Sequence, residues 1–180
     1  TIYHPNKVLI DSDFLKTLSR NEYRNGFGEV IKYGLCFDRE LFDLLFDDFE
    51  IDDVIIRCIK IKAQITETDE FENAERLLLN FGHTIGHAIE SLSNFQISHG
   101  QAIAIGMLYE VEDEEIRQKL LELYRKYNFD YQSFKAEELE SFIIQDKKIK
   151  GKDIYFPILE EIGKVKLKKM NIEDYLRRIK

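Results

Sequence analysis

The chain has 180 residues, 44% of them hydrophobic and 12% aromatic, which suits one domain, or two small ones, with a buried core. Its formal net charge of −8 disfavours binding to DNA, RNA or an anionic membrane, because all three attract clustered lysine and arginine. No apolar run approaches the roughly 20 residues that span a bilayer, and the N-terminus lacks a signal-peptide pattern, so we expect a cytoplasmic protein.

The N-terminal part of the chain predicts helices. Residues 7–11 form a short apolar run that suits a strand or an entry segment. Asp13 or Ser12 is a plausible N-cap for the helix that follows, and an interruption is expected near Gly26–Gly28. Beyond it the pattern predicts a buried helix and then two helices separated by an acidic stretch, the second beginning near residues 73–76.

Two helical segments follow in the next part of the sequence. Residues 100–129 begin with small side chains at helical spacing and continue as an amphipathic helix, and residues 133–150 predict another helix. The small residues permit close helix packing; they are Ala102, Ala104 and Gly106.

The apolar period changes to two near the C-terminus. Residues 153–159 and 163–170 predict a β-hairpin, and Pro157 places the first strand on an edge. Residues 171–180 predict a short closing helix. The expected fold class is therefore mainly α, a single multi-helix domain over residues 1–180 with a small C-terminal β-hairpin.

Cysteine and glycine usage gives two further expectations. Cys36 and Cys58 lie in apolar, helix-like stretches, so we interpret both as buried free thiols. With 9 glycines and 2 prolines, the sequence contains neither G-x-G-x-x-G nor G-x-x-x-x-G-K-[ST]. The chain by itself therefore does not form a complete nucleotide-binding domain.

Three of the four histidines lie within the stretch NFGHTIGHAIESLSNFQISHG. His83 and His87 are four residues apart on a predicted helix, a spacing that can hold one divalent ion. His99 precedes the start of another helix and can return to the same face. The spacing leaves two ligand sets open: the helical pair with a distant carboxylate, or one histidine of this helix with His99 and a carboxylate.

Two other polar groupings stand out on apolar helices. Glu29 and Lys32 are three residues apart, which indicates either an ordinary ion pair, worth about 0.3–0.5 kcal/mol if exposed, or a buried carboxylate that needs a cation or metal. A second grouping forms a polar stripe without interleaved Lys/Glu pairs, which suits an oxyanion ligand; it consists of Arg76, Asn80, His83 and His87.

These motifs together resemble the C-terminal domain of the 3-dehydroquinate synthase family. The resemblance is carried by GEVIKYG (residues 28–34), KIKAQITETDEFENAERLLLNFGHTIGHAIE (60–90) and HGQAIAIGM (99–107), in that order. DKKIKG (146–151) and the closing hairpin also fit. The resemblance covers the whole chain.

The resemblance implies a division of roles that spacing alone does not make. Glu29, His83 and His99 would hold a zinc or cobalt ion, and His87 would instead face the phosphate of the substrate. Lys32 and Asn80 would contact the same phosphate.

Further contacts are implied by the same resemblance. The remaining substrate-binding residues would be Lys62, Glu72, Arg76, Lys147 and Lys148, with one of the last two contacting the substrate. The bound NAD would lie against Phe14, Leu15, Lys16, Thr17, Leu18 and Glu22.

The implied activity is that of a lyase of the shikimate pathway, which leads to aromatic amino acids. With NAD and zinc, such an enzyme converts 3-deoxy-D-arabino-heptulosonate 7-phosphate to 3-dehydroquinate and phosphate. Members normally carry an N-terminal NAD-binding α/β domain, which this chain lacks, so we expect that domain as a partner, and a homodimer. The segment after residues 102–110 is also shorter than usual by ten or so residues.

Two alternatives remain open. One is a related sugar phosphate cyclase that forms an inosose or valiolone ring, against which Arg76 argues, because its guanidinium suits a carboxylate-bearing substrate. The other is a helical domain that binds a metal, phosphate or a protein without catalysis.

Overall fold

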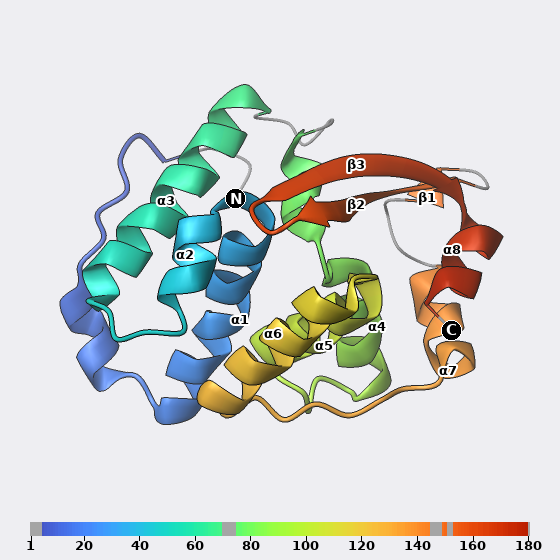
Figure 1. The fold of residues 1–180 in the computed structure, drawn as a ribbon, viewed down its shortest axis with the longest axis horizontal. Helices are drawn as coiled ribbons and strands as arrows, with labels where there is room; N and C mark the ends of the chain where they lie inside the picture. The colour runs from blue at the N-terminus through green and yellow to red at the C-terminus, as the bar shows by residue number, and fades with distance from the viewer. Residues whose placement is uncertain (1–4, 70–74, 145–148, 151–152, 180) are drawn as a thin grey trace.

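The computed structural model describes residues 5–69, 75–144, 149–150 and 153–179. Its helical elements are η1 (Ser12–Thr17), α1 (Arg20–Phe37), α2 (Arg39–Leu44), α3 (Ile51–Thr68), η2 (Glu75–Asn80), α4 (His83–Leu92), α5 (His99–Glu110), α6 (Glu114–Lys126), α7 (Ala136–Ile143) and α8 (Ile172–Arg178). Its strands are β1 (Ile149–Lys150), β2 (Asp153–Glu161) and β3 (Lys164–Asn171). The mainly α fold class is confirmed (Figure 1), and none of the described helices is both long and apolar enough to cross a membrane.

Helix α5 is the central element of the domain. On one side Ala104 and Met107 pack into an apolar cluster with α1, α2 and α6. On the other side Ala102 and Ile105 pack into a second cluster with α4, α7, α8 and β2. A helix that is apolar on all sides is buried, so α5 joins the two clusters and carries His99 at its first turn.

Helix α1 is continuous, and the expected interruption near Gly26–Gly28 is wrong. The glycine at 28 instead allows α1 to cross α5 closely, because a β-carbon there would lie 2.3 Å from the carbonyl oxygen of Gly100. The amide of Gly100 donates a 2.5 Å hydrogen bond to the side-chain oxygen of Asn25. Glycine therefore serves interhelical contact here and does not end the helix.

Helices α4 and α5 also approach closely, as the small residues predict. A β-carbon on Gly106 would lie 2.1 Å from the carbonyl oxygen of Gly82. Gly82 has the left-handed φ of 76° and precedes α4, so the single helix expected from residues 73–76 onward is wrong. The 3₁₀ helix η2 ends at Asn80 and α4 begins at His83, which divides the predicted polar stripe between two elements.

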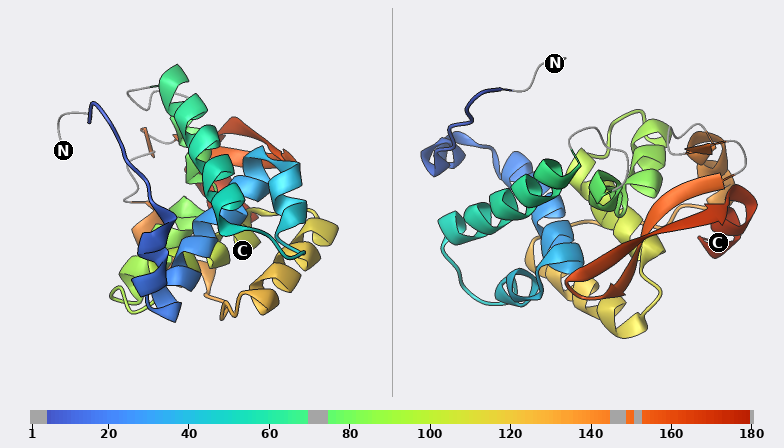
Figure 2. Two further views of the ribbon diagram at one scale, coloured as in Figure 1. Left: turned by 90° about the vertical axis from the view of Figure 1, so that its left-hand side faces the viewer. Right: turned by 90° about the horizontal axis from the view of Figure 1, so that it is seen from above.

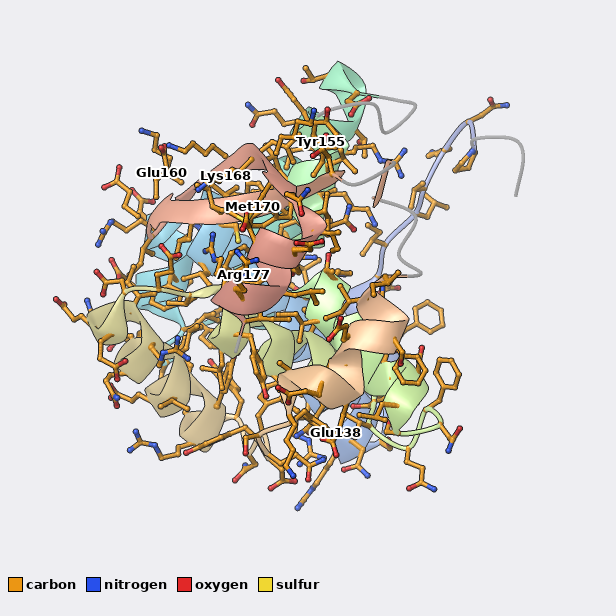
Figure 3. All side chains as sticks on the ribbon, turned by 90° about the vertical axis from the view of Figure 1, so that its right-hand side faces the viewer. Glu138, Tyr155, Glu160, Lys168, Met170 and Arg177 are labelled. Carbon is orange, nitrogen blue, oxygen red and sulfur yellow. The ribbon has the colours of Figure 1, made fainter. Side chains whose placement is uncertain are left out.

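The predicted β-hairpin is confirmed by β2 and β3, which pair antiparallel, and β1 adds a short third strand on the other side of β2. Pro157 pairs only with Leu167 of β3, because β1 reaches no further along β2 than Ile154. Figure 3 shows the face where α8 lies between this hairpin and α7.

The N-terminal segment differs from its prediction. Residues 7–11 belong to no strand, and the side chain of Asp11, rather than Ser12 or Asp13, accepts the capping hydrogen bond of η1. Figure 2 shows this segment projecting beside α1 and α3. Both cysteines are free, but only Cys36 is buried; Cys58 is partly exposed.

Candidate metal and substrate site

Three helices bring Glu29, His83 and His99 together. Glu29 of α1 follows Gly28, and His99 of α5 precedes Gly100, so the close crossing of these glycines sets the two side chains side by side. His83 opens α4, and its Nε2 lies 3.2 Å from Oε1 of Glu29, while Nε2 of His99 lies 3.6 Å from the same oxygen. One potential ligand atom from each side chain lies within 4.8 Å of the other two.

The hydrogen bonds of both imidazoles direct a lone pair toward Glu29. Nδ1 of His83 lies 3.1 Å from the carbonyl oxygen of Phe81, and Nδ1 of His99 lies 3.2 Å from Oε1 of Glu90. Because a carbonyl and a carboxylate only accept, we infer that each Nδ1 carries the proton and that each neutral ring presents an unprotonated Nε2. Oε1 of Glu29 is buried and, within the described part of the chain, has no hydrogen-bond partner.

The charge states of these groups follow from their surroundings. Burial alone raises the pKa of Glu29. When His83 and His99 carry a proton on Nε2, their hydrogen bonds and the ammonium of Lys32 outweigh burial and hold this pKa well below its ordinary value. Burial lowers the pKa of His83, against the opposing effect of Glu29. The pKa of His99 is raised, chiefly by its contact with Glu29 and in part by Glu90.

Lys32 forms a buried ion pair with Glu29. Its Nζ lies 2.6 Å from Oε2 of Glu29, and its side chain is 2% exposed. Burial lowers the pKa of Lys32, and the Glu29 carboxylate opposes that effect. The two interpretations of this pair are therefore compatible, since one carboxylate oxygen meets the ammonium and the other meets the imidazoles.

Glu90 is a site residue that the sequence pattern did not single out. It lies seven residues after His83 on α4, thus on the same helical face, which is the signal that could have identified it. Its side chain is 13% exposed and holds Nδ1 of His99. His87, Glu90 and His99 also form a second grouping with metal-ligand spacing.

His87 lies beside the three converging side chains but is exposed. Its ring centroid is 5.3 Å from that of His83 and 6.0 Å from that of His99. His83 and His87 therefore lie on one helix, α4, as their four-residue spacing predicts.

The other predicted substrate contacts that the structure describes come from η2 and α3. Arg76 and Asn80 are half-buried on η2, where the amide of Arg76 donates to the carboxylate of Asp69, 3.0 Å away. Lys62 is exposed on α3, near enough for its charge to contribute to lowering the pKa of Lys32. Three predicted contacts lie outside the described residues: Glu72, Lys147 and Lys148.

The residues predicted to contact NAD form an exposed surface on and after η1. This helix buries none of its residues, and Phe14 and Leu18 are 76% and 45% exposed. The segment lies beside α1 and α3 (Figure 2). The other predicted contacts on it are Leu15, Lys16, Thr17 and Glu22.

Comparison with known proteins gives the family. Residues 26–149 match the family described as 3-dehydroquinate synthase C-terminal. The chain belongs to this family. The matched stretch contains all three converging side chains, Glu29, His83 and His99.

Relatives in the 3-dehydroquinate synthase family resemble the chain along nearly its whole length. It is 36% identical to a 3-dehydroquinate synthase of Streptococcus thermophilus, over 99% of this chain and 56% of the relative. It is 39% identical to one of Clostridium acetobutylicum, over 97% of this chain and 55% of the relative. The chain thus spans about half the length of these relatives.

Solved structures share the fold of this family member. A 2-epi-5-epi-valiolone synthase from Streptomyces hygroscopicus, with NAD+ and Zn2+ bound, has a TM-score of 0.77 at 22% identity, over 94% of this chain and 54% of that one. A 2-deoxy-scyllo-inosose synthase complexed with carbaglucose-6-phosphate, NAD+ and Co2+ has a TM-score of 0.74 at 22% identity, over 94% and 55%.

Proposed function

We propose that this chain is the metal-binding and much of the substrate-binding part of a 3-dehydroquinate synthase. The enzyme converts 3-deoxy-D-arabino-heptulosonate 7-phosphate to 3-dehydroquinate and phosphate, with NAD and a zinc or cobalt ion. The observation that carries the proposal is the convergence of three electron-pair donors, from Glu29, His83 and His99, on one buried point.

This donor set fits a divalent metal ion. An unprotonated imidazole nitrogen that faces a carboxylate oxygen cannot share a hydrogen with it, so a cation between the two relieves their repulsion. One carboxylate and two imidazoles are a ligand set that zinc takes in catalytic sites, with a position left for substrate. When bound, the ion supplies Lewis-acid polarisation of the substrate hydroxyl that is oxidised.

The neighbouring basic residues bind the phosphate in this proposal. The ring of His87 is exposed next to the metal ligands, so it can donate a hydrogen bond to a phosphate oxygen while the backbone of α4 stays in place. Asn80 supplies an amide donor from η2, and Lys32 supplies positive charge from the buried side. Together they orient the phosphate for its elimination. The elimination follows oxidation of the carbon two positions from the one that carries the phosphate, because the new ketone makes the proton on the carbon between them acidic.

Arg76 selects for an acidic substrate. Its guanidinium matches the two oxygens of a carboxylate, whereas a neutral sugar phosphate offers no such partner. The substrate hydroxyls are bound by Lys62 of α3, Glu72 and one lysine of Lys147–Lys148. The exposed η1 segment, with Phe14 and Leu18, contacts the NAD that the N-terminal part of the enzyme binds.

The decisive experiment is a phosphate-release assay of the full-length protein with NAD and zinc. We expect release from 3-deoxy-D-arabino-heptulosonate 7-phosphate to exceed release from glucose 6-phosphate by at least about 100-fold, the discrimination that about 3 kcal/mol gives. A preference for the neutral sugar phosphate would favour an inosose- or valiolone-type cyclase. Absence of release from either substrate, in a protein that binds zinc, would favour a binding domain without catalysis.

A further inference from the structure

Glu110 is a buried carboxylate at the end of α5 that does not reach the converging ligand atoms. It is 2% exposed. Its Oε2 accepts a hydrogen bond from the amide of Gly82, 2.7 Å away, and its Oε1 accepts one from the hydroxyl of Tyr175 on α8, 3.0 Å away. A buried carboxylate is costly unless it is well hydrogen-bonded, so this placement requires a reason.

The amide that Glu110 binds shares a peptide group with the carbonyl that binds His83. The carbonyl oxygen of Phe81 lies 3.1 Å from Nδ1 of His83, and the next amide along the chain is that of Gly82. This peptide is trans, so its N–H and C=O point in opposite directions. Glu110 and His83 therefore bind the two ends of one peptide dipole.

We propose that Glu110 is a positioning residue for His83, acting through the peptide between Phe81 and Gly82. The inference rests on the proposed function, in which His83 is a metal ligand. A metal-bound histidine is commonly oriented by a carboxylate or a carbonyl on its other nitrogen. Here the carboxylate polarises the peptide, and the polarised carbonyl holds the proton on Nδ1 of the ring.

The peptide needs such a restraint because of where it lies. Gly82 has a left-handed φ of 76°, and glycine reaches many other conformations at little cost. The 3₁₀ helix η2 ends two residues earlier, and α4 begins one residue later. The hydrogen bond from Gly82 to Glu110 selects the orientation that aims the Phe81 carbonyl at His83.

The arrangement parallels that of the other imidazole. His99 contacts the carboxylate of Glu90 directly through its Nδ1. His83 reaches the carboxylate of Glu110 through one peptide group. Each of the two converging histidines is thus connected on its outer nitrogen to a largely buried carboxylate.

A purely structural role makes a different prediction. Gly82 is the N-cap of α4, and a carboxylate near a helix N-terminus stabilises that helix. If Glu110 only capped α4, its loss would lower the stability of the protein but leave the tautomer of His83 and the zinc affinity of the folded protein unchanged.

Two substitutions in the full-length protein separate these roles. Glu110→Met removes charge and acceptor at similar volume, and Glu110→Gln keeps an acceptor for Gly82. By competition with a chelator, we expect zinc affinity to fall about tenfold or more in Glu110→Met and about threefold in Glu110→Gln.

Tyr124→Phe is the matched control. It deletes a buried hydrogen bond to the carbonyl of Ala104, 2.6 Å away on the same helix α5, without touching the Phe81–Gly82 peptide. It should lower the thermal stability yet leave zinc affinity within about twofold of the wild type.

A readout without metal distinguishes this inference from the proposed function. In the metal-free protein, ¹⁵N NMR of the histidine rings should show the His83 proton on Nδ1, a mixture of tautomers in Glu110→Met, and partial recovery in Glu110→Gln. Loss of the fixed tautomer in a protein that binds no zinc would support the positioning role and contradict the metal site.

Other outcomes overturn the positioning role. A wild-type tautomer and wild-type zinc affinity in Glu110→Met would do so, even if its stability is lower. Where Glu110→Met does not fold, the same two wild-type results in Glu110→Gln would overturn it.

Discussion

Gly28 of α1 and Gly100 of α5 cross in direct backbone contact, since a β-carbon on Gly28 would lie 2.3 Å from the carbonyl oxygen of Gly100. Their chain neighbours Glu29 and His99 face one another at this crossing, with 3.6 Å between Oε1 and Nε2. Because Gly28 and Gly100 carry no side chains, the two helices approach closely enough to place the candidate metal ligands Glu29 and His99 at this distance.

Gly28→Ala should therefore separate the two helices and weaken the site. We expect the free energy of unfolding to fall by about 1–3 kcal/mol, the usual cost of overpacking, and zinc affinity to fall as Glu29 moves from His99. Denaturant unfolding and zinc titration of the full-length protein measure the two effects.

Gly26→Ala is the control for that substitution. Gly26 lies in the same helix with no other group within 4 Å of a β-carbon there. Alanine at this position should raise stability by up to about 1 kcal/mol through helix propensity alone. Equal effects at Gly26 and Gly28 would contradict the role of the crossing.

Glu90 should support metal binding through His99 rather than bind the metal itself. Glu90→Gln keeps an acceptor for Nδ1 of His99 and removes the charge, so we expect zinc affinity to fall by about 10-fold, within the range for such partners. Chelator competition measures the change. Complete loss of zinc in Glu90→Gln, with binding retained in Glu29→Gln, would instead favour the grouping of His87, Glu90 and His99.

The pH dependence should identify His99 as the first imidazole to take up a proton. Its pKa is raised chiefly by Glu29, whereas burial lowers the pKa of His83. Protonation of His99 therefore stabilises the metal-free fold, and this stabilisation is complete at a pH below about 6.5, the ordinary pKa of histidine in the unfolded chain. The stabilisation is lost as the pH rises through the higher pKa that His99 has in the folded protein. Zinc needs the unprotonated nitrogen, so its affinity should fall as the pH is lowered through the same range.

Histidine NMR of the metal-free protein checks the order of these titrations. His99 should titrate above the ordinary value and His83 below it. Glu90→Gln should lower the pKa of His99, because it removes one of the charges that raise it. A pKa of His83 above that of His99 would contradict the assignment.

His87 should act on the phosphate without holding the metal. His87→Ala is expected to keep zinc and to reduce phosphate release by about 100-fold, the lower range for loss of a positioned proton donor. The affinity for inorganic phosphate, by calorimetry in the zinc-loaded protein, should fall as well. Unchanged phosphate affinity and release would contradict this role.

Periodicity and local signals predicted most of the helices, the hairpin and the pairing of Glu29 with Lys32 on one helical face. They misplaced the start of the histidine helix, because Gly82 in its left-handed conformation interrupts a stretch whose apolar pattern continues. Glycine near position 28 resembled a helix break, since a sequence does not show that another backbone lies against it. Glu110 gave no signal, because its partners lie 28 and 65 residues away in the chain.

The spacing of the histidines allowed two sets of metal ligands, and the family resemblance favoured Glu29, His83 and His99. His83 and His87 share a helical face, yet His83 is buried against Glu29 and His87 is exposed. That difference arises because α1 crosses α5 so that Glu29 faces His83, the first residue of α4. The i,i+4 spacing contains no information about this crossing.

Zinc stoichiometry of the full-length protein and four single variants tests whether Glu29, His83 and His99 together hold one metal ion. We expect one zinc ion per chain in the wild type and in His87→Ala. We expect loss of zinc in Glu29→Ala, His83→Ala and His99→Ala, because each of these removes one of three ligands. Loss of zinc in His87→Ala, with one ion retained in Glu29→Ala, would contradict this ligand set.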